Sequence, residues 1–150
     1  MSERRRDSRG VSLTTIITGQ DEAIAAWAFQ TWGCQPFHVN MAIGLANDEG
    51  ELVGAFAFSG YNGSDAEIHV LAPGHLNRRT VRLIFGLALR QLNLNRLTVR
   101  TRKPSMARGV MKLGAKYECT VRRLYGPTDS DEDAGLQFAF FRETIEKLAR

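Results

Sequence analysis

Two ionisable residues in a short alternating stretch could carry out proton transfer. Glu67 and His69 are separated by one residue within positions 66–72, where apolar residues alternate with polar or bulkier ones. This period of two predicts a strand, and residues i and i+2 of a strand share one face. A carboxylate or an imidazole held there can act as a general base. Glu67 is the first candidate and His69 the second; the alternative for both is a solvent-facing polar side chain.

Basic residues follow this stretch, where a loop leads into a predicted helix. Pro73 and Gly74 end the predicted strand, and Arg78, Arg79 and Arg82 lie at the start of the helix. Backbone N–H groups and the positive end of the helix dipole bind phosphate, and arginine adds bidentate contacts. The candidate phosphate-binding residues are His75, Asn77, Arg78, Arg79, Thr80 and Arg82.

The charges are unevenly distributed along the chain. The sequence has 150 residues, with 20 Lys or Arg, 16 Asp or Glu and a net charge of +4. Residues 11–74 hold seven carboxylates and no Lys or Arg, whereas residues 75–126 hold 13 Lys or Arg and a single acid, Glu118. This local excess predicts a polyanionic partner, either a phosphorylated cofactor or nucleic acid. A solvated basic face without a ligand is the third interpretation.

Length and composition favour one soluble domain in a reducing compartment. A chain of 150 residues with 43% hydrophobic residues can build its own core. Cys34 and Cys119 are too few for a disulfide scaffold or a four-thiolate zinc site, and no apolar run is long enough to span a membrane. We expect a cytoplasmic protein without a metal, with a disordered basic tail at residues 1–10 and one domain at residues 11–150.

Hydrophobic periodicity predicts an α+β, or mixed α/β, architecture on one central sheet. Strands are predicted at residues 12–18, 41–46, 52–59, 66–72, 96–101, 116–125 and 136–141. Helices are predicted at residues 21–32, 81–92 and 104–113 and from about 143 onward. An antiparallel meander precedes a strand–helix–strand unit, which predicts a parallel or adjacent pair. The clearest helix pattern places one apolar face on Val81, Ile84, Phe85, Ala88 and Leu89.

Three segments carry a family resemblance. They are residues 41–55, residues 79–99, and the run Lys112-Leu-Gly-Ala-Lys-Tyr-Glu-Cys-Thr-Val-Arg122, which is similar to the pattern K-L-G-F-x-x-E-G-x-x-R. In these segments the sequence resembles the GCN5-related N-acetyltransferase superfamily, especially its small bacterial and phage members. Residues 41–55 resemble strands two and three of the family, and residues 79–99 resemble the helix after its pyrophosphate loop and the strand that follows. The resemblance covers residues 42–143, about two thirds of the chain.

This resemblance implies a fold, a cofactor and a reaction. The fold would be a single domain with a mostly antiparallel, twisted sheet, splayed between strands four and five and flanked by helices. The reaction would be acyl transfer from acetyl-CoA, or another acyl-CoA, to a primary amine of a small molecule or protein. The pantetheine arm would lie along Val70 and Leu71, and Lys103 would join the phosphate-binding residues. The basic half would then face coenzyme A, so nucleic acid is not needed to explain the charge.

The sequence departs from the family pattern at positions that serve coenzyme binding and catalysis. No glycine lies between His75 and Phe85, although the family's loop is usually glycine-containing. Lys103 stands where these proteins usually have Asn, and Val110 stands where many have the tyrosine that protonates the departing thiolate. The candidates that could replace this acid are Ser105, Tyr61 and water.

Two other functions stay open on the sequence. The departures favour a catalytically weak or inactive acetyltransferase-fold protein that binds a partner protein, as a regulator or phage-type effector. The third interpretation is a nucleic-acid-binding module, with a steep dependence on salt. A homodimer is compatible with these functions. The nucleic-acid module would use Arg78, Arg79, Arg82, Arg100, Arg102 and Lys103.

Overall fold

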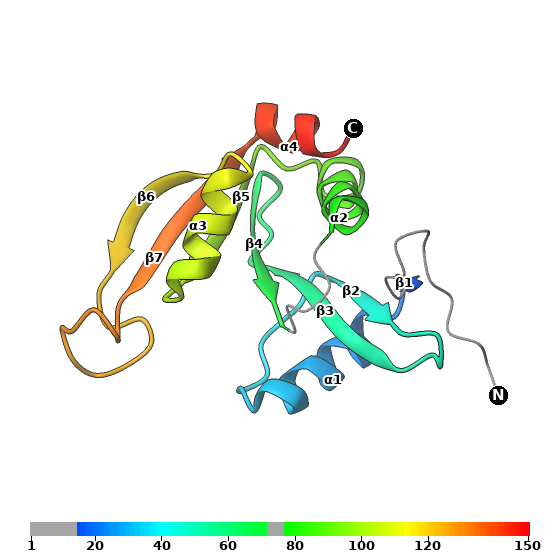
Figure 1. Ribbon diagram of the computed structural model, residues 1–150, viewed down its shortest axis with the longest axis horizontal. Coiled ribbons are helices and arrows are strands. Elements are labelled where there is room, and N and C mark those ends of the chain that lie inside the picture. Colours follow the sequence, from blue (N-terminus) through cyan, green and yellow to red (C-terminus); the bar gives the residue numbers. More distant parts are fainter. Residues whose placement is uncertain (1–14, 72–76) are drawn as a thin grey trace. The chain divides into compact units, whose positions relative to one another are not determined.

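Seven strands and four helices make up the described part of the chain. The computed structural model describes residues 15–71 and 77–150 (Figure 1). The strands are β1 Thr15–Ile17, β2 Met41–Ala46, β3 Leu52–Ser59, β4 Asp65–Val70, β5 Arg96–Thr101, β6 Lys116–Val121 and β7 Gly135–Phe141. The helices are α1 Asp21–Trp32, α2 Arg78–Arg90, α3 Pro104–Lys112 and α4 Arg142–Leu148.

The strands form one sheet in the order β1-β2-β3-β4-β5-β7-β6. β1 to β3 form an antiparallel meander, and β5, β7 and β6 pair antiparallel. β4 and β5 are parallel, with a register that runs from Asp65↔Arg96 to Glu67↔Thr98. The predicted mixed α/β class and its parallel pair are therefore confirmed. The chain divides into two compact units, residues 1–60 with 68–80 and residues 61–67 with 81–150, so β4 contributes to both.

In the first unit, α1 packs on β2 and β3 through small side chains (Figure 1). Ile24 and Ala28 of α1 form a buried cluster with Ala55 and Ala57 of β3. Gly44 of β2 belongs to the same surface, because a Cβ there would lie 3.3 Å from the Ile24 Cδ1 atom. The face of β3 that carries Ala55 and Ala57 is thus the surface on which the helix packs.

The second unit is built around aromatic residues of β7. Phe140 packs edge-to-face on Phe85 of α2, with ring centroids 4.8 Å apart, and α3 packs on β5 and β7 (Figure 1). Ile84, Phe85 and Ala88 are buried as predicted. Val81 and Leu89 are only half-buried, whereas Leu87 is buried, so the apolar face of α2 is rotated relative to the predicted one.

Three predicted strands extend beyond the observed ends of β1 at Ile17, β4 at Val70 and β6 at Val121. β6 ends at Val121, not at residue 125. Arg122 and Arg123 turn away to pair with Asp129, and Arg123 adopts a φ of 57°, which a strand does not allow. β1 begins at Thr15, and the earlier residues of that predicted strand lie outside the described residues, as does the predicted tail at residues 1–10.

Candidate active site

Glu67, the first candidate base, lies on β4 beside an arginine of β5. It is in register with Thr98 across the parallel strands, and its side chain is 26% exposed. The Glu67 Oε2 atom lies 3.9 Å from Arg100 Nη1, which makes an ion pair. Arg100 is itself fixed, since its Nε donates a hydrogen bond to Gln137 Oε1 of β7 at 2.9 Å. Arg100 therefore couples the candidate base to the neighbouring strands of the same unit.

Tyr125 belongs to this group of side chains, and the sequence analysis did not identify it. The guanidinium carbon of Arg102 lies 5.5 Å from the centre of the Tyr125 ring. The ring also covers Gly135, where a Cβ would come within 3.1 Å of Tyr125 Cε2. Partial burial, followed by the negative charge of Glu67, raises the pKa of the Tyr125 phenol above its usual value. The phenol therefore stays protonated at neutral pH.

The segment between β6 and β7 holds Tyr125 in place through local hydrogen bonds. The Tyr125 N–H donates to the Asp133 carbonyl at 2.8 Å. The Asp133 carboxylate accepts hydrogen bonds from the hydroxyl and the backbone N–H of Thr128, which lower its pKa. Asp129 accepts a hydrogen bond from Arg123 Nε at 2.8 Å, and this bond lowers the pKa of Asp129. These hydrogen bonds connect residues within the segment between β6 and β7.

His69, the second candidate base, lies in the other unit, where it contacts Ser59 and Phe37. Its Nε2 atom lies 2.7 Å from the Ser59 hydroxyl oxygen of β3. Its ring packs on Phe37, with centroids 4.6 Å apart. Ser59 and Phe37 both restrict the orientation of the imidazole. The tautomer of His69 decides whether its Nε2 or the Ser59 hydroxyl donates the hydrogen bond.

Asn77 forms the N-terminal cap of α2. Its side-chain oxygen accepts a hydrogen bond from the Thr80 N–H at 2.9 Å and lies 3.1 Å from the Thr80 hydroxyl. Thr80 is 1% exposed, so its N–H and its hydroxyl are both shielded from solvent. Arg78 and Arg79 are exposed. Among the other predicted coenzyme contacts, Leu71 is buried and Val70 half-buried, Arg82 and Lys103 are exposed, and His75 lies outside the described residues.

The two protein groups considered as replacements for the missing acid lie in different settings. The Tyr61 hydroxyl donates a hydrogen bond to the Leu92 carbonyl at 2.8 Å, which ties the segment before β4 to the end of α2. Ser105 is exposed in the first turn of α3. Val110 is 7% exposed in the same helix, so its side chain is part of the core. The placement of these residues gives Tyr61 a structural partner and leaves Ser105 accessible.

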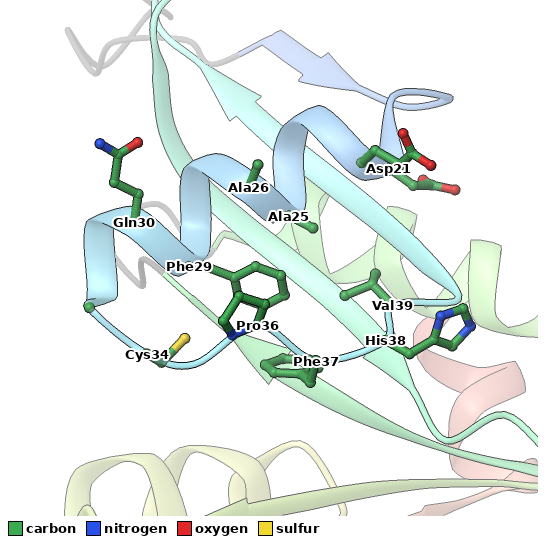
Figure 2. A pocket seen from close by; sticks show the side chains of 12 residues that line it. Asp21, Ala25, Ala26, Phe29, Gln30, Cys34, Pro36, Phe37, His38 and Val39 are labelled. Atoms are coloured by element: carbon green, nitrogen blue, oxygen red, sulfur yellow. The ribbon is translucent and has the colours of Figure 1, made fainter.

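A pocket of about 810 Å³ opens in the first unit between α1 and residues 33–39 (Figure 2). Phe29 and Phe37 form its aromatic wall, with ring centroids 4.8 Å apart. Asp21 stands at the start of α1, and its Oδ1 accepts a hydrogen bond from the Ala42 N–H at 2.9 Å. None of the predicted catalytic or coenzyme-binding residues lines this pocket.

No family model and no curated protein matches this sequence, but solved structures do. A mutant form of the spermidine/spermine N-acetyltransferase SpeG from Vibrio cholerae matches with a TM-score of 0.69 and 11% identity, over 92% of this chain and 100% of that one. The SpeG complex with manganese ions matches with a TM-score of 0.67 and 12% identity, over 91% and 97%. The complex with CoA and spermine gives 0.65 and 11%, over 89% and 98%.

This chain has the GCN5-related N-acetyltransferase fold. The resemblance drawn from the sequence is thereby confirmed at the level of fold, although identity to these structures is only 11–12%. In the acetyltransferase fold of this chain, Glu67 lies on the strand that begins the parallel pair, as the sequence analysis predicted. The basic helix start that follows is α2.

Two further features of this acetyltransferase fold concern metals and membranes. Within residues 15–71 and 77–150, no group of three or more His, Cys, Asp or Glu side chains is arranged to hold a metal ion. In the same residues, no helix has the length and apolar character needed to cross a membrane. Cys34 and Cys119 are both exposed and form no disulfide.

Proposed function

We propose that this chain is an acyl-CoA-dependent N-acyltransferase that moves an acetyl group from acetyl-CoA to a primary amine of a small molecule or protein. The supporting observation is the fold, which the chain shares over 92% of its length with a solved N-acetyltransferase. A structure of the same Vibrio cholerae protein contains CoA and spermine, which makes acyl-CoA the donor to test first.

The start of α2 and other basic residues of the chain would bind the coenzyme. Arg78, Arg79 and Arg82 are exposed, and their guanidinium groups have the donor geometry that phosphate needs. Lys103 is also exposed and would add a cation. Asn77 and Thr80 shape this helix start, and the pantetheine arm would follow Val70 and Leu71. These residues fit a polyanionic nucleotide such as coenzyme A.

Glu67 would act as the general base of the transfer. The acceptor nitrogen attacks the thioester carbonyl carbon, a C–N bond forms, and the C–S bond to coenzyme A breaks. Glu67 takes the proton from the nitrogen, directly or through water, and the coenzyme thiolate takes a proton from solvent, Ser105 or Tyr61. The Arg100 guanidinium, 3.9 Å from the carboxylate, helps to hold Glu67 in place on β4. His69 is the second candidate for this role.

A second candidate function is a partner-binding protein with little turnover. The buried Val110 supports it, because this residue has no proton to give and its side chain lies in the core. The absence of glycine between His75 and Phe85 also supports it, since main-chain approach to a pyrophosphate favours glycine.

One experiment with two readouts separates the two functions. Calorimetric titration with acetyl-CoA measures donor binding, and a thiol-release assay with pooled amines and proteins measures transfer. Saturable binding together with amine-dependent thiol release supports the transferase. Binding without thiol release from any acceptor supports the partner-binding protein, and no binding contradicts the proposed donor.

A further inference from the structure

Arginine and carboxylate side chains surround Glu67 in its own unit. Arg100 lies 3.9 Å from its carboxylate. The charges of Glu67, Arg100 and Arg102 all affect the pKa of the Tyr125 phenol. Two other carboxylates of this unit, Asp65 of β4 and Glu118 of β6, have a different partner, because both pair with Arg96. Arg100 is thus the guanidinium beside Glu67, whereas Arg102 lies over the Tyr125 ring and also acts on the Asp133 carboxylate.

Arg100 is placed to bind an anionic group. Its Nε donates to Gln137, which orients the guanidinium plane. The 3.9 Å distance to Glu67 Oε2 is too long for a hydrogen bond, so the ion pair leaves N–H donors for a ligand. The side chain is 38% exposed, which gives a ligand access to it.

Arg102 is held by a different contact and completes the pair. It follows Arg100 by two positions and lies directly after the end of β5. Its guanidinium lies over the Tyr125 ring, and such stacking leaves the N–H edge of the guanidinium open to a carboxylate. The ring lies close to Gly135, where a Cβ would come within 3.1 Å of Tyr125 Cε2. Tyr125 thus positions Arg102.

We propose that the acceptor is an amino acid, whose amine meets Glu67 and whose carboxylate is bound by Arg100 and Arg102. This inference rests on the proposed function and defines its acceptor class. The short distance between Arg100 and Glu67 requires the amine and the acid to lie only a few bonds apart, as they do in an α-amino acid. A polyamine carries several positive charges and no acid, so the two arginines would repel it.

The test compares acceptors that differ only in the acid. Thiol release from acetyl-CoA is measured with alanine, phenylalanine and aspartate, with the α-amide of each, and with spermidine. The amine of each amide is less basic than that of the acid, so a larger fraction of it is unprotonated at neutral pH. A preference for the acids therefore cannot come from the reactivity of the amine. We expect kcat/KM to be at least about tenfold higher for the best acid than for its amide, as charge-assisted hydrogen bonds allow.

Variants assign the preference to the two arginines. The double variant Arg100→Gln with Arg102→Gln should remove the preference while acetyl-CoA binding, measured by calorimetry, shows that the fold is intact. Arg108→Gln removes an exposed arginine of α3 and should keep the preference. Equal rates for acids and amides, faster transfer to spermidine, or an unchanged preference in the double variant would overturn the inference while leaving the transferase intact.

The amino-acid site can also be tested if the protein shows no turnover. If acetyl-CoA binds but no acceptor releases thiol, the proposed transfer fails. The same acids and amides are then titrated into the acetyl-CoA complex. Binding of an acid, with loss of binding for its amide and in the double variant, supports the amino-acid site. Equal binding of both forms, or no binding of either, overturns it.

Discussion

Arg96 of β5 and Glu118 of β6 form an ion pair across β7, the strand that lies between them. Arg96 Nη1 donates to Glu118 Oε2 at 3.0 Å, and Nη2 contacts the other carboxylate oxygen. On β7, the Gln137 side chain donates to Glu118 Oε1 at 3.1 Å. Asp65 of β4 lies 3.3 Å from Arg96 Nε. This network joins four strands, and the hydrogen bond from Arg96 lowers the pKa of Glu118.

Acidification should destabilise the protein through Glu118. Because its folded-state pKa lies below the unfolded value of about 4.3, the carboxylate contributes stability above that pH and loses it as the pH falls through the folded-state pKa. Glu118→Gln should lower the free energy of unfolding at pH 7 by up to about 1 kcal/mol and flatten its decline below about pH 4. Urea unfolding measures both effects. The exposed Glu132→Gln is the control, and equal acid sensitivity in the two variants contradicts the assignment.

Replacing Arg78 and Arg79 together by Ala should weaken acetyl-CoA binding about thirtyfold, or ~2 kcal/mol, because charge-assisted hydrogen bonds to the phosphates are lost. Calorimetry gives the affinities. The double variant Arg108→Ala with Lys112→Ala removes two basic residues of α3 and should bind normally. Equal affinity of the Arg78 and Arg79 variant and the wild type would place the phosphates elsewhere.

Phe85→Ala should reduce the free energy of unfolding by about 3–5 kcal/mol, because the ring is 5% exposed and packs on Phe140. Met111→Ala is the comparison: its side chain is 48% exposed, and the loss should stay below about 1 kcal/mol. Thermal and urea unfolding followed by circular dichroism measure both. A cooperative Phe85→Ala protein with wild-type stability would contradict the packing of α2.

Asn77→Ala should cost about 1 kcal/mol of stability, because the N–H of Thr80 loses its cap. Asn77→Ser retains a capping oxygen and should recover most of the loss. Urea unfolding of the three proteins at pH 7 measures the difference. Equal losses for both substitutions would show that the capping oxygen is not what stabilises this helix start.

Glu67→Gln keeps the shape of the side chain and removes the base. In the proposed reaction the rate of thiol release should fall by about 10²-fold or more, while acetyl-CoA affinity stays nearly unchanged. Glu49→Gln, in the exposed hairpin between β2 and β3, controls for the change in net charge. A Glu67→Gln protein as fast as the wild type would move the role of base to His69 or to water.

Local sequence patterns predict the elements whose partners lie nearby in the chain. Ala55 and Ala57 recur on one face of a predicted strand, and the preceding helix of the chain packs on that face with Ile24 and Ala28. The Asn47 turn signal likewise predicts a hairpin, and the Asn47 side chain accepts the Glu49 N–H at 3.0 Å. In such cases periodicity and turn chemistry contain the necessary information.

Tyr125 could not be found in this way. Its neighbours are Arg102 after β5, Gly135 at the start of β7 and Glu67 of β4, which are brought together by the strand order β4-β5-β7-β6. Periodicity does not specify that order. The cap at Asn77 did have a signal, since Asn before a helix and three residues ahead of Thr80 is an N-cap pattern. Its position in a basic loop favoured the phosphate interpretation instead.

The cap at Asn77 also affects how a charged ligand could be held at this end of α2. Because the Asn77 oxygen already takes the Thr80 N–H, fewer main-chain donors face outward there. The attraction for a polyanion then depends on the long, hydrated side chains of Arg78 and Arg79. Dissolved ions screen such surface charges over about 8 Å at physiological ionic strength. Coenzyme occupancy would therefore vary with the ionic composition of the surroundings, more than in a protein that holds the pyrophosphate through glycine amides.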